Sequence, residues 1–117
     1  MNQEIKQRWI QALRSGEYKQ GTSTLKFQDR FCCLGVLCDL HAKETGNEWN
    51  DYPEEGFRSD YLEDEATLPD AVMDWAGLSE HDPVVRTGES TVRGIAYYND
   101  HEKYKFDELA DLIEMYL

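Results

Sequence analysis

The longest apolar stretch of the chain lies at residues 30–41 and reads RFCCLGVLCDLH. Placed on a helix, it shows two apolar faces, and only a narrow strip of Cys32, Gly35 and Asp39 lies between them. A helix that is apolar on two faces is normally enclosed by other elements. A strand is the alternative, since a short apolar run is ambiguous by periodicity alone, but the length favours a helix. The pattern therefore predicts a buried central helix.

Gly35 indicates how this helix is packed. A glycine inside a helix costs roughly 1 kcal/mol relative to alanine. We therefore expect that another backbone packs closely against it.

Three further segments have helical periodicity. Residues 2–14 place their apolar side chains on one stripe, and Ser15-Gly16 ends the pattern. Residues 68–77 begin with Leu-Pro-Asp, a favourable helix start, and end at Gly77. Residues 106–117 repeat apolar side chains at helical spacing and predict a closing helix.

Strand patterns are short. Residues 24–27 alternate and predict one strand, and a second is expected near residues 57–61. Residues 83–86 favour a third. Residues 18–21 are predicted to be a loop, and residues 28–30 a turn into the central helix.

The segment that follows allows two interpretations. Ser90 can cap a helix that runs to Tyr98, or residues 84–86 can pair with residues 91–93 in a β-hairpin. In either case the order of elements predicts the α+β class. We expect a helix-dominated single domain over residues 1–117, with a buried central helix and two or three short strands.

Charge adds a second feature. The chain has 117 residues, which suits one domain with one core, and a formal net charge of −12. Residues 44–82 hold thirteen acids against one base, Arg58, and so carry the whole excess.

Within them, residues 44–67 combine breakers with aromatic residues, which predicts an ordered, acidic, loop-rich segment lying on the core. The acids are either a solvated surface or a docking face for a basic partner. Direct nucleic-acid binding is disfavoured, because this field repels phosphates.

The cysteines and the apolar content indicate the compartment. Cys32, Cys33 and Cys38 are an odd number with two direct neighbours, which argues against a disulfide framework and favours free thiols in the core. No stretch approaches the roughly 18 apolar residues of a membrane span, and the N-terminal residues lack a signal-peptide pattern. We therefore expect a cytoplasmic protein.

A zinc site at Cys33, Cys38 and His41 is disfavoured, since no CxxC pair exists, and no metal or cofactor is expected.

Four motifs occur in a fixed order along the chain. They are WxxALRSG at residues 9–16, FCCLGVLCDL at 31–40, LPDAVMDWAGL at 68–78, and Asn99-Asp100 followed by FxxLADLIE at 106–114. On these motifs the chain resembles a group of small uncharacterised proteins encoded by bacteriophages and prophages. That group usually has a Leu-rich segment before the Asn-Asp pair, where this chain has Ala96-Tyr97-Tyr98. The resemblance implies an origin, an architecture and, for a phage protein, the host cytoplasm; it implies no activity and no catalytic residue.

The leading functional hypothesis is a small acidic binding protein without catalysis. It would interfere with a host nucleic-acid-binding or defence protein, by placing carboxylates in a basic groove that normally takes phosphates. The candidate partner-binding residues are Asp60, Glu63, Asp64 and Glu65.

Two alternatives are kept. A small, nucleotide-like molecule would bind in a pocket beside Gly35, where the flanking polar groups are Arg14, Arg30, Asn99 and Asp100. A cysteine hydrolase would instead use Cys32 as the nucleophile, because a helix start lowers the pKa of a thiol. Its helpers would be Asp39 on the same strip and His101 as the base.

Overall fold

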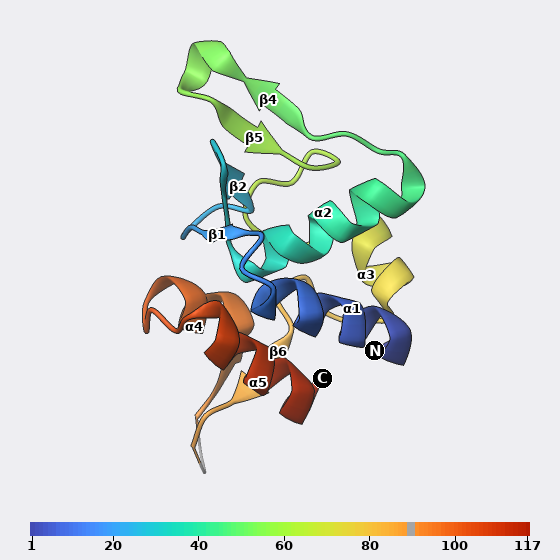
Figure 1. Cartoon of the computed structure of the whole chain (residues 1–117), viewed down its shortest axis with the longest axis vertical. Helices are drawn as coiled ribbons and strands as arrows, with labels where there is room; N and C mark the ends of the chain where they lie inside the picture. The colour runs from blue at the N-terminus through green and yellow to red at the C-terminus, as the bar shows by residue number, and fades with distance from the viewer. Residues whose placement is uncertain (89–90) are drawn as a thin grey trace.

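Helix α2 (Cys33–Thr45) lies at the centre of the computed structural model, which describes residues 1–88 and 91–117 (Figure 1). The buried central helix is confirmed. Its buried residues are Cys33, Leu34, Gly35, Val36, Leu37, Cys38, His41 and Ala42. The helix begins at Cys33, three residues after the start of the apolar stretch, because Arg30 and Phe31 lie in a strand. It ends at Gly46, whose φ of 78° is the left-handed conformation that glycine adopts at low cost.

Gly35 is where the chain crosses closest to this helix. A Cβ at Gly35 would lie 1.8 Å from the carbonyl oxygen of Leu25 and 2.7 Å from its carbonyl carbon. The same oxygen accepts a hydrogen bond from the Cys32 N–H at 3.2 Å, which fixes the crossing at the start of the helix. The predicted backbone contact is confirmed. The pocket expected beside Gly35 is wrong, since the backbone of Leu25 fills that space.

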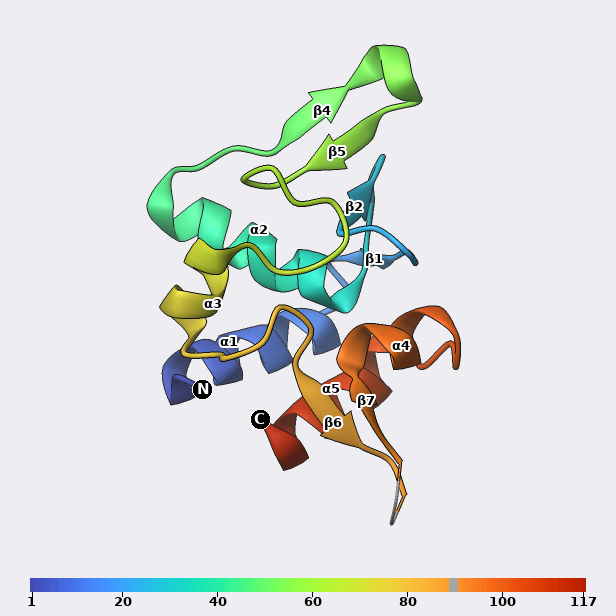
Figure 2. The same cartoon turned by 180° about the vertical axis from the view of Figure 1, so that it is seen from behind.

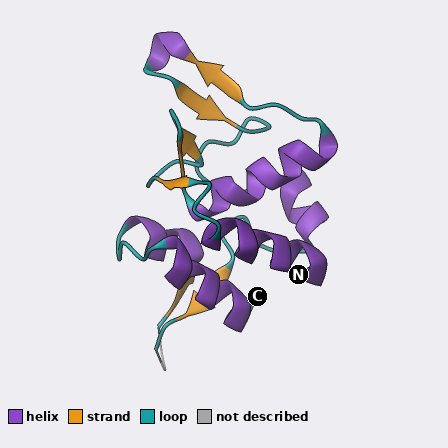
Figure 3. Ribbon diagram, in the orientation of Figure 1, coloured by secondary structure: helices purple, strands orange, loops and turns teal. Residues whose placement is uncertain are grey.

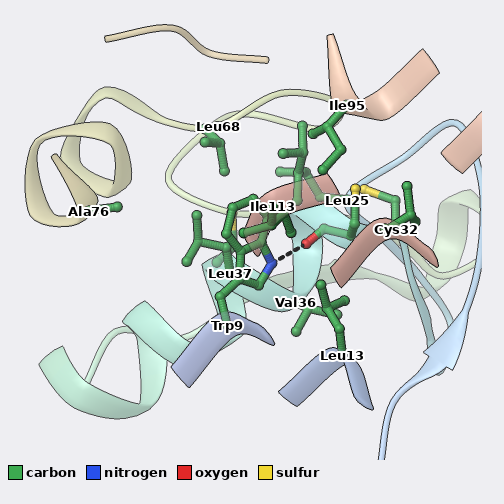
Figure 4. Close-up of a cluster of buried hydrophobic side chains, with 14 of the residues drawn as sticks. Trp9, Leu13, Leu25, Cys32, Val36, Leu37, Leu68, Ala76, Ile95 and Ile113 are labelled. Carbon is green, nitrogen blue, oxygen red and sulfur yellow. Dashed lines mark hydrogen bonds between the residues drawn. The ribbon is translucent and has the colours of Figure 1, made fainter. Parts of the chain in front are cut away.

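Four other helices surround α2. Helices α1 (Gln3–Arg14) and α5 (Phe106–Tyr116) pack against each other, and α1, α3 (Asp70–Ala76) and α4 (Ile95–Asp100) contact α2 directly. Trp9 of α1 is fully buried, and its Nε1 donates to the carbonyl oxygen of Cys33 at 2.9 Å (Figure 4). The three predicted outer helices at residues 2–14, 68–77 and 106–117 are therefore present. None of the described helices is long and apolar enough to cross a bilayer.

A five-stranded sheet covers the other side of α2 (Figure 3). Its strands are β1 (Lys19–Gln20), β2 (Lys26–Phe27), β3 (Arg30–Phe31), β4 (Asn50–Tyr52) and β5 (Arg58–Asp60), in the spatial order β1-β3-β2-β5-β4. Strands β1 and β3 are parallel, and the other pairs are antiparallel.

The sheet corrects two local predictions. The stretch 18–21, predicted to be a loop, contains β1, and residues 28–30 lead from β2 into β3 before the helix begins. Gln28 makes that turn with a φ of 57°. Strands of two residues carry no alternation that a sequence pattern can reveal; only pairing with distant residues defines them. The α+β class is confirmed, with a larger sheet than the two or three strands expected.

A separate hairpin decides between the two interpretations of the segment before α4. Strands β6 (Val84–Arg86) and β7 (Val92–Gly94) pair antiparallel, and α4 begins only at Ile95. The hairpin interpretation is therefore confirmed; the proposed cap at Ser90 lies outside the described residues. The helix begins late because the Asp82 carboxylate accepts the Ala96 N–H at 3.0 Å, a contact that arises only in the folded chain.

At one end of the molecule, β4, the 3-10 turn η1 (Pro53–Glu55) and β5 project beyond the helices as a hairpin (Figures 1 and 2). The molecule is elongated as a result, with extents of 45 × 27 × 25 Å. Both termini lie among the helices, away from this hairpin (Figure 1).

The Gly35 crossing predicts a large penalty for any side chain there. Gly35→Ala should lower the free energy of unfolding by at least about 2 kcal/mol, because overpacking against a backbone outweighs the gain in helix propensity. Urea unfolding followed by circular dichroism measures the change. Gly88→Ala is the control, since among the described residues its Cβ would meet only the Thr91 hydroxyl oxygen, at 3.8 Å. Equal stability of the two variants would contradict the crossing.

Candidate functional site

The projecting hairpin belongs to the most acidic part of the chain. We call residues 48–65 the acidic arm; it holds eight acidic residues and a single basic one, Arg58. The arm contains all four predicted partner-binding carboxylates. Their geometry shows that they do not act alike.

Asp60 is a structural residue of the hairpin. Its side chain is buried, with 7% of the residue exposed, and it accepts hydrogen bonds from Asn50 Nδ2 and Tyr52 Oη, both at 2.8 Å. Both donors come from β4, so the carboxylate ties the two strands together. Asp60 therefore does not lie on an open docking face.

Glu65 is likewise engaged inside the arm. It forms an ion pair with Arg58, and Arg58 also pairs with Glu55 at 2.8 Å. The guanidinium lies 4.0 Å from the centre of the Tyr52 ring, and its hydrogen bond to Glu55 raises the pKa of Arg58. Arg58 thus balances part of the arm's charge and holds its sheet face together.

Glu63 and Asp64 lie together in a tight turn. Tyr61 and Asp64 exchange backbone hydrogen bonds at 2.8 and 3.0 Å, and the turn forces Leu62 and Glu63 to φ values of 50° and 76°. With Asp70 and His81 the two acids line an open pocket of about 570 Å³. Within the described residues, no cluster of acidic, histidine or cysteine side chains could hold a metal ion.

The tip of the arm carries a feature that the sequence analysis missed. Phe57 has a φ of 63°, and 54% of the residue is exposed. Its ring borders an open hollow of about 380 Å³, lined also by Lys26, Gln28, Asp51 and Ser59. The dipeptide Gly56-Phe57 could have suggested a turn, but no sequence signal predicts that the phenylalanine itself takes the left-handed conformation.

The free carboxylates surround this tip and the root of the arm. Glu48, Glu54 and Glu63 are exposed, and across the described residues none of the three has an ion-pair partner. These are the acids of the arm whose charge is available to a partner. Two of them, Glu48 and Glu54, were not among the predicted residues.

The root of the arm is fastened to α2 by polar side chains. Asp39 accepts hydrogen bonds from Tyr18 Oη at 2.6 Å and from Trp49 Nε1 at 3.1 Å, and it pairs with Lys43 at 3.2 Å. Burial opposes ionisation of Asp39, but these hydrogen bonds outweigh it and lower the pKa of the carboxyl. Asp39, the proposed helper of Cys32, is therefore a fully bonded anchor.

A second contact between the arm and α2 lies two residues further along the helix. His41 Nδ1 and Tyr61 Oη are 2.6 Å apart in the buried interior, and the His41 ring meets Trp75 of α3 edge-on. Burial lowers the pKa of His41 below its ordinary value of 6.5. The neutral form of the His41 side chain therefore links α2, the arm and α3.

The geometry of Cys32 disfavours the hydrolase alternative. The residue is 2% exposed, and burial raises the pKa of the thiol to about 12. The lowering of the thiol pKa that was expected at a helix start is present, because the thiol has backbone hydrogen bonds with Gly35 and Leu34. Burial raises the pKa by more than these hydrogen bonds lower it. All three cysteines are free and buried. His101 is exposed at the end of α4, with its ring 5.2 Å from that of Tyr97.

The predicted small-molecule residues separate into two pairs. Asn99 is 1% exposed: its Oδ1 accepts from Cys33 N–H and Gln20 Nε2, and its Nδ2 donates to the Gly21 carbonyl. Asp100 accepts the Ser23 N–H at 2.9 Å. This pair fixes α4 to the start of α2 and to the β1–β2 loop. Arg14 and Arg30, in contrast, line one open pocket.

Comparison with known proteins places the chain in a family. A family model described as a domain of unknown function (DUF8296) matches residues 1–117. The chain belongs to this family. No curated protein and no solved structure is significantly similar to it.

Because the three thiols are buried, we expect them to react slowly with thiol reagents. A thiol-reactive probe should leave Cys32, Cys33 and Cys38 unlabelled in the native protein, because the thiolate is both scarce and shielded. Mass spectrometry before and after unfolding in guanidinium checks this, and the unfolded chain should take up three labels. Rapid, unique labelling of native Cys32 would instead support the hydrolase.

The His41 contact predicts acid sensitivity. A histidine whose pKa is lower in the folded chain than in the unfolded chain leaves the unfolded state with more protons, so stability falls as the pH drops from about 7 toward 5. Urea unfolding at several pH values measures the slope. His41→Gln keeps an acceptor for Tyr61 and should flatten the slope, whereas His101→Gln, at an exposed position, should not. The same slope in both variants would remove His41 as the cause.

Proposed function

We propose that this chain is a non-catalytic binding protein whose acidic arm docks on a basic surface of a partner protein. The arm's exposed Phe57 enters an apolar depression of the partner, and the free carboxylates of the arm pair with lysines and arginines. The partner is a host protein that itself binds nucleic acid, and the arm occupies the groove that takes phosphates.

Phe57 is the observation that carries the proposal. A bulky residue in the left-handed region costs about 1–2 kcal/mol relative to glycine, and its exposed ring gains little burial in return. Glycine or asparagine would make the same turn more cheaply. A strained, solvent-exposed aromatic residue at the tip of a projecting hairpin is typical of an interface anchor, since aromatic residues dominate binding hot spots.

The surroundings of Phe57 favour a basic partner. Glu48, Glu54 and Glu63 are exposed without ion-pair partners in the described structure, and Asp51 borders the hollow beside the ring. Asp51 itself pairs with Lys26, which also lines the hollow, so the free charge that an arginine of the partner would meet is that of the exposed glutamates. An apolar centre with a charged rim is the ordinary anatomy of a protein interface.

The charge of the molecule supports the kind of partner. The net charge of −12 repels nucleic acid but attracts the basic proteins that bind it. The resemblance to phage and prophage proteins supports a partner from the host bacterium. The function that follows is competition for a nucleic-acid-binding surface.

The strained tip allows a test that separates binding from folding. Phe57→Asn relieves the left-handed strain, so stability should stay equal or rise by about 1 kcal/mol, while binding of the partner should fall at least about tenfold. Affinity capture from bacterial lysate identifies the partner, and titration of the purified pair measures the affinity. Tyr116→Asn is the matched control, because Tyr116 is 43% exposed at the far end of α5.

Variants that neutralise exposed glutamates of the arm test the contribution of charge to binding, independently of Phe57. Glu48→Gln with Glu54→Gln should weaken binding and reduce its sensitivity to salt, because fewer charges attract the partner. Glu4→Gln with Glu17→Gln removes the same charge from exposed positions on and just after α1 and should leave binding unchanged. Equal effects of the two pairs, or a captured protein that binds Phe57→Asn as tightly as the native chain, would disprove docking by the arm.

A further inference from the structure

A second surface of the molecule brings several basic side chains together. An open pocket of about 650 Å³ lies between the α1–β1 connection, the start of β3 and the start of α5. Four of the chain's twelve basic residues line it, namely Arg14, Lys19, Arg30 and Lys105, against one carboxylate, Asp107. All of them lie outside the acidic window 44–82.

Two of the cations are free to meet a ligand. Arg14 pairs with Asp111 and Glu114 at 2.6 and 3.1 Å, and Lys19 pairs with Asp29 at 2.8 Å. Arg30 donates only to the carbonyl oxygen of Gln20 at 3.3 Å. In the described part of the chain, neither the Arg30 guanidinium nor the Lys105 ammonium has a carboxylate partner; Glu108 accepts only the backbone N–H of Lys105.

The rest of the lining suits an organic molecule. Tyr18 supplies apolar surface beside the cations, with smaller contributions from the largely buried Leu13 and Phe106. The Tyr18 hydroxyl is held by Asp39, which leaves its ring as a wall of the pocket. Small-molecule sites commonly combine apolar walls with a few polar groups, in volumes of roughly 300–1,000 Å³.

We infer that this pocket binds a small organic phosphate. Arg30 and Lys105 hold the phosphate, and the carbon skeleton of the ligand lies against Tyr18 and Phe106. The site is separate from the acidic arm, so it stands or falls independently of partner docking.

Thermal unfolding in the presence of three probes tests the ligand class. AMP should raise the melting temperature of the full chain with increasing concentration, and inorganic phosphate should do so more weakly, because it lacks the apolar part. Adenosine should have no effect, since it lacks the anion. A flat response to AMP, or an equal response to AMP and adenosine, would overturn the proposal.

Variants locate the site. Arg30→Gln and Lys105→Gln should each weaken AMP binding by about tenfold, the loss of one charge-assisted contact, as measured by calorimetry. Lys6→Gln removes one positive charge outside the pocket and should bind AMP like the native chain. If Lys6→Gln weakens binding as much as Lys105→Gln, AMP responds only to overall charge and the pocket is not its site.

The two proposed sites are distinguished by one further measurement. Phe57→Asn should bind AMP with native affinity, and Arg30→Gln should retain the protein partner. Loss of AMP binding in Phe57→Asn would contradict the separate pocket, whichever result the docking experiments give.

Discussion

The contact between the Leu25 carbonyl and Gly35 is the constraint on which the other contacts of this structure depend. It brings a backbone within van der Waals distance of the central helix, at a place where any side chain would collide. Strand β2 follows Leu25 directly, so the crossing determines where the five-stranded sheet lies on α2. It also leaves Cys32 and Cys33 enclosed, which makes these thiols part of the core and raises their pKa by burial.

From this core the acidic arm is held out by a few polar contacts. Asp39 and His41, two residues apart on α2, bind Trp49 and Tyr61 at the two ends of the arm. Asp60 then ties β4 to β5 inside the hairpin. Acidic residues of one chain segment thus serve two purposes. Those with bonded carboxylates build the arm, and those without partners give its surface a charge that the fold itself does not use.

The charge is separated along the chain as well as in space. The acidic arm carries its free carboxylates at its root and near its tip, where Phe57 is exposed, while Arg30 and Lys105 lie at a pocket built from the α1–β1 connection and the start of α5. Each surface combines an apolar element with uncompensated charge of one sign. This combination is the ground on which we propose a binding function for each surface.

The sequence by itself determined the elements whose physics is local. The central helix, the three outer helices and the α+β class follow from apolar periodicity, and the burial of another backbone at Gly35 follows from the cost of glycine in a helix. Only the tertiary structure decided the rest. Strands of two residues exist because distant partners complete their hydrogen bonds, as β1 does with β3. Asp60 and Glu63 look equivalent in the sequence, yet one is enclosed by Asn50 and Tyr52 and the other is exposed. The strain at Phe57 depends on long-range geometry, and so does the placement of Arg30 and Lys105 in the lining of one pocket. No local pattern of residues contains this information.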